Sequence, residues 1–327
     1  MTDPPRAGLG ELVVEFASLS ETGPVRGSNE DSLGFGPVAP LPGVRLASPS
    51  RAPVERGPGA FVAPSLVELP PGLPHHVGGG AGGHTPAGVR GGCASPPAAG
   101  LLFAVADGLG AYGGGDVASR LAVENLLGHC RDAAADSRAP GMLRGAFDRA
   151  NRAVFDAALS GAGARKMQTT MTALLLAPGE GHVAHVGDCR LYRLRAGALD
   201  LLTTDHTQVM EMLRLRMISP EQAVDHPGRY ALTRSLGGDL IVRTDVRREP
   251  VLDGDTFLIG SDGLWGKVDA AEIQEAMAGD LGRACAGLVE RAVERGGEDN
   301  STLVAVRVVS AGVAAVRPQG WRRFFQS

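Results

Sequence analysis

The chain has 327 residues, a formal net charge of −4, and 43% hydrophobic but only 4% aromatic residues. This length and apolar content suffice for one large domain with its own core, and the slightly acidic balance excludes nucleic acid as a partner. No run of 18 apolar residues, no basic-then-apolar leader and no closely spaced cysteine pair is present. We therefore expect a cytoplasmic protein with no membrane span, secretory signal, disulfide framework or zinc site.

The first elements expected in chain order are two strands, at residues 11–20 and 31–35. Residues 37–100 follow, and 13 prolines and 13 glycines are found among these 64 residues. Such a composition cannot bury enough apolar surface to offset the conformational entropy of the chain. The sequence therefore predicts a disordered insert between two core strands.

The next run, residues 101–107, is apolar and ends in Asp107, which is typical of a buried strand. Further β-rich runs, broken by turn residues, are expected at 169–177, 182–188, 190–202, 255–262 and 301–309. Helical periodicity predicts helices at 116–130, 141–159, 207–217, 269–278 and 282–295. Strands come in runs and helices in pairs, which favours antiparallel sheets with segregated helices over βαβ alternation.

Several acids occupy the same kind of position, at one end of a predicted strand and close to glycine. They are Asp107, Asp188, Asp262 and Asp299, with Glu30 and Asp31 in a fifth cluster just before a strand. Buried carboxylates repel one another unless cations lie between them, and oxygen-only ligand sets suit Mg²⁺ or Mn²⁺. A single Asp-Gly at a strand end is usually only a turn, but the ordered set favours a metal site. A dinucleotide site is disfavoured, because "DGLGAYGGG" is followed by a predicted helix and lacks the acid expected about 20 residues later at the end of a second strand.

These motifs resemble those of the bacterial metal-dependent protein phosphatases, the PPM or type 2C Ser/Thr phosphatases. The matching motifs, in family order, include "TGPVRGSNEDS" (22–32), "FAVADGLGAYGGGDVAS" (103–119), "HVGDCRLYRLR" (185–195), "DTFLIGSDGLWGKV" (255–268) and "GGEDNSTLVAV" (296–306). The resemblance implies an α+β fold, a four-layer αββα sandwich of two antiparallel β-sheets flanked by helices. The phosphatase domain is expected to span 11–309, interrupted by the insert and followed by a tail at 310–327.

The resemblance also implies a role for each candidate residue. Asp107 would bridge two metal ions, the Gly108 carbonyl would bind one of them, and Asp262 and Asp299 would hold the second. Glu30 and Asp31 would mostly hold metal-bound waters, and Asp188 with Asp262 would form a third, weaker metal site. Arg26 would grip the substrate phosphate, although a plain ion pair with Glu30 is the alternative.

The implied activity is hydrolysis of phosphoserine and phosphothreonine in proteins, with two Mn²⁺ or Mg²⁺ ions as cofactor. Two cations sharing one water lower its pKa toward the neutral range, which supplies hydroxide without a protein nucleophile. Expected partners are phosphorylated proteins, including a Ser/Thr kinase and its substrates. The alternative is a pseudophosphatase, a binding or scaffold module with the same fold in kinase signalling.

Four further expectations concern Cys189, Arg190, Leu109 and the segment 203–238. Cys189 stands where the family usually carries serine and is expected to be structural, and Arg190 is expected to be an ion-pair partner. Leu109 stands where animal relatives carry a general-acid histidine, so the leaving group must take its proton elsewhere. Residues 203–238, which we call the flap segment, resemble the family's mobile flap and predict a helix, a turn and a second short helix.

Overall fold

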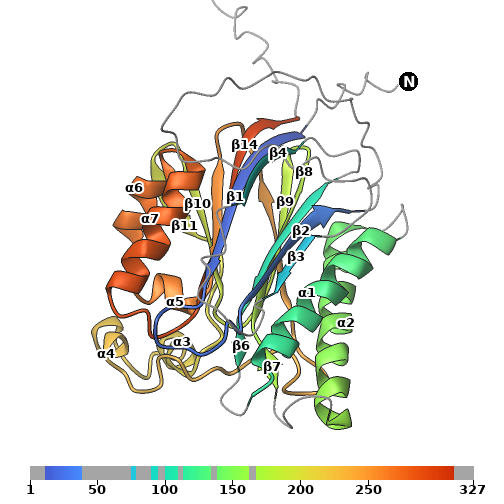
Figure 1. Cartoon of the computed structure of the whole chain (residues 1–327), viewed down its shortest axis with the longest axis vertical. Helices are drawn as coiled ribbons and strands as arrows, with labels where there is room; N and C mark the ends of the chain where they lie inside the picture. Colours follow the sequence, from blue (N-terminus) through green and yellow to red (C-terminus); the bar gives the residue numbers. More distant parts are fainter. Residues whose placement is uncertain are drawn as a thin grey trace, which may run out of the picture.

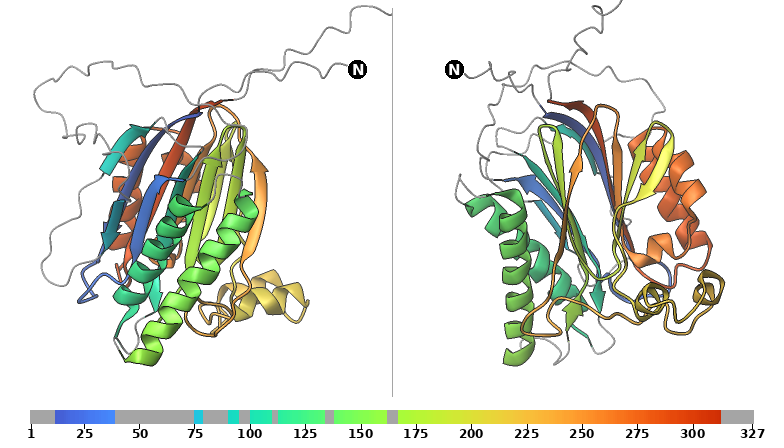
Figure 2. Two further views of the ribbon diagram at one scale, coloured as in Figure 1. Left: turned by 90° about the vertical axis from the view of Figure 1, so that its right-hand side faces the viewer. Right: turned by 180° about the vertical axis from the view of Figure 1, so that it is seen from behind.

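The computed structural model describes residues 12–38, 75–78, 90–94, 100–109, 113–133, 138–161 and 167–312. Two six-stranded antiparallel sheets lie face to face, and a pair of helices covers the outer side of each (Figure 1, Figure 2). This arrangement is the α+β, four-layer αββα sandwich that the sequence predicted.

The strands of the first sheet, in spatial order, are β11 (Ala198–Leu201), β10 (Arg190–Arg195), β13 (Thr256–Gly260), β14 (Ser301–Ala311), β1 (Leu12–Glu21) and β4 (Arg90–Ala94). Those of the second are β12 (Asp245–Pro250), β9 (Glu180–Val186), β8 (Met171–Ala177), β5 (Leu101–Ala106), β2 (Ser32–Pro37) and β3 (His75–Gly78). A short ribbon of β6 (Gly108–Leu109) and β7 (Gln168–Thr169) extends from the second sheet. The long pairing of β1 with β14 joins the two ends of the domain.

Two strands lie inside the stretch for which the sequence predicted disorder. β3 pairs with β2, and β4 pairs with β1, so each occupies the outer edge of a sheet. An edge offers unpaired backbone groups to any extended segment, and this pairing needs little apolar burial. Composition therefore failed to predict these two strands, while the rest of the insert lies outside the described residues. Its two ends meet where the Val38 amide donates to the Gly100 carbonyl at 3.2 Å, so the insert leaves and re-enters the sheet at one place.

The central strand β5 explains why the middle of the sequence reads as continuous apolar runs. Leu102 and Ala104 face α1 (Gly115–Asp132) and α2 (Ala139–Ser160), whereas Phe103 and Val105 face the opposite sheet. Successive side chains of a strand point to opposite faces, and both faces of this sheet are covered. Alternation of polar and apolar residues is therefore absent from β5.

The first sheet is covered by α6 (Ala270–Met277) and α7 (Leu281–Glu294), which pack on β13, β14 and β1. The short helix α5 (Asp262–Trp265) follows β13 directly. The flap segment holds α3 (Gln208–Arg214) and α4 (Pro220–Val224), which confirms the predicted helix, turn and second helix. No helix in the described part of the chain is long and apolar enough to cross a membrane.

Candidate functional site

The predicted acids come together at one end of the sandwich, in turns that belong to both sheets. Asp107 follows β5, Asp188 lies between β9 and β10, Asp262 follows β13, Asp299 precedes β14, and Asp31 precedes β2. Asp31 and Asp188 are buried, and the side chain of Asp299 is 39% exposed. We call these five residues the acidic cluster.

Burial and mutual repulsion raise the pKa values of carboxyl groups in the acidic cluster. Desolvation is the largest cause of the pKa of Asp107 lying well above its usual value, and the charges of Asp31, Asp262, Asp188 and Asp299 raise it further. Desolvation, with the charge of Asp262 next, likewise raises the pKa of Asp188 well above its usual value. The described residues therefore concentrate more negative charge at this end of the sandwich than neighbouring groups neutralise.

Asp31 is the most deeply buried acid of the cluster. Desolvation raises its pKa to about 8, although hydrogen bonds from Thr302 and Ser261 oppose the rise. The Ser261 hydroxyl donates to its Oδ2 at 2.8 Å, and its own amide donates to the Asn29 side chain at 3.0 Å. Hydrogen bonds thus fix Asp31 in a buried position.

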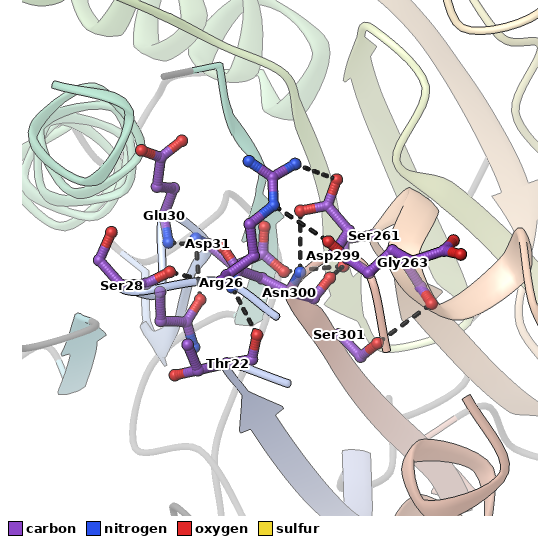
Figure 3. Close-up of polar contacts among 12 residues, drawn as sticks. Thr22, Arg26, Ser28, Glu30, Asp31, Ser261, Gly263, Asp299, Asn300 and Ser301 are labelled. Carbon is purple, nitrogen blue, oxygen red and sulfur yellow. Dashed lines mark hydrogen bonds and ion pairs between the residues drawn. The ribbon is translucent and has the colours of Figure 1, made fainter. Parts of the chain in front are cut away.

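Arg26 lies at the rim of the acidic cluster, and its side chain is 45% exposed. Its guanidinium donates to Asp299 Oδ2 at 2.7 Å and to the Glu298 carbonyl at 3.2 Å (Figure 3). Partial desolvation lowers the pKa of Arg26, but the charges of Asp299, Glu30 and Asp107 outweigh it and raise that pKa. The arginine predicted to bind phosphate is therefore a close neighbour of the predicted metal ligands.

Glycines let three chain segments approach each other beside Asp107. A Cβ atom on Gly108 would lie 2.2 Å from the Gly115 carbonyl oxygen and 2.5 Å from that of Glu30. A Cβ on Gly115 would lie 2.6 Å from Glu30 Oε2. Any side chain at these two positions would displace its neighbours, which explains why residues 108 and 115 are glycines.

Asn300 is a functional neighbour that the sequence did not reveal. Its Oδ1 accepts from the Glu30 amide at 2.8 Å, while its Nδ2 donates to the carbonyls of Thr22 at 2.9 Å and Ser28 at 3.1 Å (Figure 3). The side chain is 3% exposed. One buried amide therefore fixes the loop carrying Arg26 and Glu30 against the segment carrying Asp299.

The turn between β9 and β10 is held from three sides. Trp265 Nε1 donates to the Asp188 carbonyl at 3.0 Å, and the Arg190 guanidinium lies 3.6 Å above the Trp265 ring. Arg190 pairs with Asp205 of the flap segment at 2.7 Å, so its expected ion-pair role is confirmed. Burial raises the pKa of the Cys189 thiol well above its usual value, and its Sγ lies 3.1 Å from Thr170 Oγ1. Cys189 is therefore structural, as expected.

The chemistry of the acidic cluster fits hard divalent cations. The donor groups are carboxylate oxygens and nearby carbonyls, and Asp262 Oδ1 is buried without a hydrogen-bond partner in the described chain. Among the residues that the structure describes, no group of three or more His, Cys, Asp or Glu side chains has a geometry that could hold a metal ion. Asp299 instead contacts Arg26, and Asp31 contacts Ser261.

Comparison with known proteins identifies relatives of this sandwich. A family model described as Protein phosphatase 2C matches residues 93–291. The serine/threonine phosphatase stp of Listeria monocytogenes is 35% identical over 210 residues, which are 63% of this chain and 83% of that protein. The serine/threonine protein phosphatase PstP of Mycobacterium tuberculosis is 34% identical over 218 residues, which are 66% of this chain and 42% of that protein.

Solved structures agree with this relationship. The Mycobacterium tuberculosis phosphatase PstP/Ppp superposes with a TM-score of 0.65 at 27% identity, covering 90% of this chain and 99% of that one. A PstP catalytic domain in complex with two manganese ions gives a TM-score of 0.64 at 26% identity, with 91% and 100% covered.

The αββα sandwich of this chain is the fold of these solved serine/threonine phosphatases. The chain belongs to the protein phosphatase 2C family. The predicted family and the predicted enzyme class are thereby confirmed.

Proposed function

We propose that the chain hydrolyses phosphoserine and phosphothreonine in proteins, using two divalent cations, Mn²⁺ or Mg²⁺, held by the acidic cluster. The observation that carries this proposal is the meeting of Asp107, Asp262 and Asp299, from three distant parts of the sequence, with charge that their surroundings do not neutralise. The stp and PstP relatives are named serine/threonine phosphatases, and one PstP structure contains two manganese ions. Both findings support the proposal.

The proposal gives each predicted residue a role. Asp107 and the Gly108 carbonyl would hold one cation, and Asp262 and Asp299 the other, with Asp107 shared. Glu30 and Asp31 would act through water, and Asp188 with Asp262 would hold a third, weaker ion. Bound cations supply Lewis acidity, which lowers the pKa of water and offsets negative charge on phosphoryl oxygens.

The chain itself supplies positioning and charge. Thr169 Oγ1 and the Thr170 amide donate to the Asp107 carbonyl at 2.7 and 2.8 Å, which fixes the backbone beside the reacting phosphate. The exposed guanidinium of Arg26 presents the planar set of donors that binds phosphate oxygens in pairs. Its contact with Asp299 keeps it at the rim of the cluster when no substrate is bound.

The test compares three variants on phosphothreonine peptides in the presence of Mn²⁺. Asp107→Asn and Asp262→Asn should each lower turnover by about 10²-fold or more, because each removes charge required at the cations. Asp239→Asn, an exposed acid outside the acidic cluster, should retain wild-type turnover. A wild-type protein that releases no phosphate with Mn²⁺ or Mg²⁺ would contradict the proposal.

A calorimetric titration with Mn²⁺ separates an enzyme from the pseudophosphatase alternative. The enzyme should bind at least two ions per chain, and Asp107→Asn should abolish the tighter binding. A scaffold module should show little binding heat in either protein. On this proposal, the substrates of the enzyme are phosphorylated proteins, including targets of a Ser/Thr kinase.

A further inference from the structure

A cavity of about 560 Å³ lies between α2, the edge strand β12 and the start of the flap segment. It is lined by residues of all three elements and contains none of the residues assigned to the acidic cluster. Its volume lies within the range of roughly 300–1,000 Å³ that is typical of small-molecule sites.

The walls of this cavity carry an excess of hydrogen-bond donors. Arg144 comes from α2, Arg243 lies just before β12, and Arg247 lies within β12. Arg247 already donates to the Leu202 carbonyl at 2.9 Å and pairs with Glu249. Arg144 and Arg243 are exposed and have neither a hydrogen bond nor an ion pair to any residue that the structure describes.

The acids that line the cavity leave this positive charge largely unopposed. Asp245 is already paired, with Arg234 at 2.9 Å and His206 at 3.3 Å. Asp148 lies one helical turn beyond Arg144 on α2, and it forms no ion pair within the described part of the chain. Two free guanidinium groups therefore face one exposed carboxylate.

Threonine hydroxyls provide further polar groups in the same walls. Thr203 Oγ1 accepts from the Leu191 amide at 3.1 Å, which leaves its hydroxyl hydrogen free to donate. Thr244 also lines the cavity, and its hydroxyl is buried with no partner among the described residues. Buried hydroxyls without partners are uncommon, so a missing partner is informative.

We propose that this cavity binds a small phosphate-bearing anion, at a site separate from the acidic cluster. Guanidinium groups bind phosphate through paired, charge-assisted hydrogen bonds, and arginines that face open space without a carboxylate partner are ready to do so. A phosphate held by Arg144 and Arg243 would join α2 to the residues leading into β12.

The cavity is connected to the acidic cluster by a short chain of contacts. His185, in the cavity wall, lies ring to ring with His206 at 4.7 Å. The His206 amide donates to the Gly187 carbonyl at 2.7 Å, and His206 Nδ1 accepts from the Gly187 amide at 3.0 Å. Gly187 immediately precedes Asp188, so a bound anion is expected to stabilise the turn that carries this acid.

Calorimetry on metal-free protein tests the site without any dependence on phosphatase activity. The probes are orthophosphate, as free phosphate, and ADP, as phosphate carried on a nucleotide. At least one should bind at one ion per chain, and Arg144→Gln and Arg243→Gln should each weaken it about tenfold or more. Arg283→Gln, on α7 at the opposite face, and Arg26→Gln should change the affinity no more than about twofold.

Hydrogen exchange locates the bound probe independently. Amides at 185–190 and 202–207 should exchange more slowly with the probe, and Arg243→Gln should remove this protection. Absence of binding by both probes would overturn the proposal. So would binding that Arg26→Gln abolishes and the cavity variants leave intact, since the anion would then lie at the acidic cluster.

Discussion

Asn300 shows how an uncharged residue organises an acidic site. Its carboxamide both accepts from the Glu30 amide and donates to two carbonyls, which a carboxylate of the same shape cannot do. The structure therefore uses an amide at a position where another acid would disrupt the loop. The neighbouring Asp299 carries the negative charge instead.

Replacing this amide by a carboxylate should damage stability and activity together. Asn300→Asp turns two donated hydrogen bonds into contacts between oxygen atoms and adds charge beside the acidic cluster. We expect the free energy of unfolding to fall by about 2 kcal/mol or more, and phosphatase turnover to fall with it. Urea denaturation and a phosphopeptide assay measure the two effects.

Asn125→Asp is the matched control for that substitution. Asn125 makes a single side-chain hydrogen bond, to the Leu121 carbonyl within α1, and lies away from the acids. Its replacement should cost no more than about 1 kcal/mol and leave turnover unchanged. Equal losses in both variants would show that Asn300 has no special role.

The acids themselves could be predicted from the sequence because each one directly follows or precedes a recognisable apolar run, and most of them lie beside glycine. Asn300 could not, because an asparagine after an aspartate at a strand start looks like an ordinary turn residue. Its hydrogen bonds reach the Thr22 and Ser28 carbonyls, which lie more than 270 residues earlier in the chain. Nothing local in the sequence encodes such partners.

At the scale of elements, the start of α1 sets how closely the loop that carries Glu30 can approach this helix. The helix begins at Gly115, directly under Glu30, and its N-cap Gly114 has the left-handed φ of 93°. The Ser119 hydroxyl, one turn further along, donates to the Glu30 carbonyl at 2.6 Å. The helix therefore acts as a platform for the loop as well as a cover for the sheet.

Two glycine-to-alanine substitutions in α1 should differ in their effects, since one lowers turnover and the other raises stability. In Gly115→Ala the new methyl group would lie 2.6 Å from Glu30 Oε2 and 2.9 Å from the Gly108 carbonyl carbon. It should push the loop away and lower turnover at least tenfold, on the order of 1.4 kcal/mol in the activation barrier. Gly128 has open space around its Cβ position, so Gly128→Ala should raise the free energy of unfolding by about 1 kcal/mol.

Turnover and urea denaturation of both variants provide the measurement. A Gly115→Ala enzyme with wild-type turnover would show that the loop tolerates displacement. The contrast between the two positions removes helix propensity as an explanation, because both substitutions lie in the same helix.

Elements with a clear side-chain pattern could be predicted, whereas edge strands without such a pattern could not. Helices such as α2 and α7 carry apolar residues at helical spacing, and their predicted bounds agree with the structure to within two residues. β12 was not expected, because its sequence DVRREP is mostly charged and only one residue is buried. An edge strand depends on backbone pairing with β9, which side-chain patterns do not report.

For the whole molecule, the two sheets bring buried carboxylates to one end, and the folded state has to tolerate them. Desolvation and the neighbouring charges of Asp262 and Asp299 raise the pKa of Asp31 from 3.8 to about 8. In this interval the folded chain holds a proton on Asp31 that the unfolded chain has lost. The metal-free fold therefore loses stability as pH rises from about 4 to about 8.

Asp31→Asn should remove the part of this dependence that Asp31 contributes. Relative to the variant, the wild-type free energy of unfolding should fall by about 1.4 kcal/mol for each pH unit within the interval. Buried His185, whose pKa is lowered to about 3 by desolvation first and the charge of His206 second, gives the opposite trend below pH 6.5. Because His185 is present in both proteins, its effect cancels in the difference between them.

Urea denaturation of metal-free protein at pH 5, 6, 7 and 8 measures that difference directly. Asp239→Asn, at an exposed position outside the acidic cluster, should show the same pH dependence as the wild type. If the difference in the free energy of unfolding between wild type and Asp31→Asn stayed constant, Asp31 would be ionised in the folded state over this whole pH range. The acidic cluster would then have to be neutralised by groups other than a proton on this carboxyl.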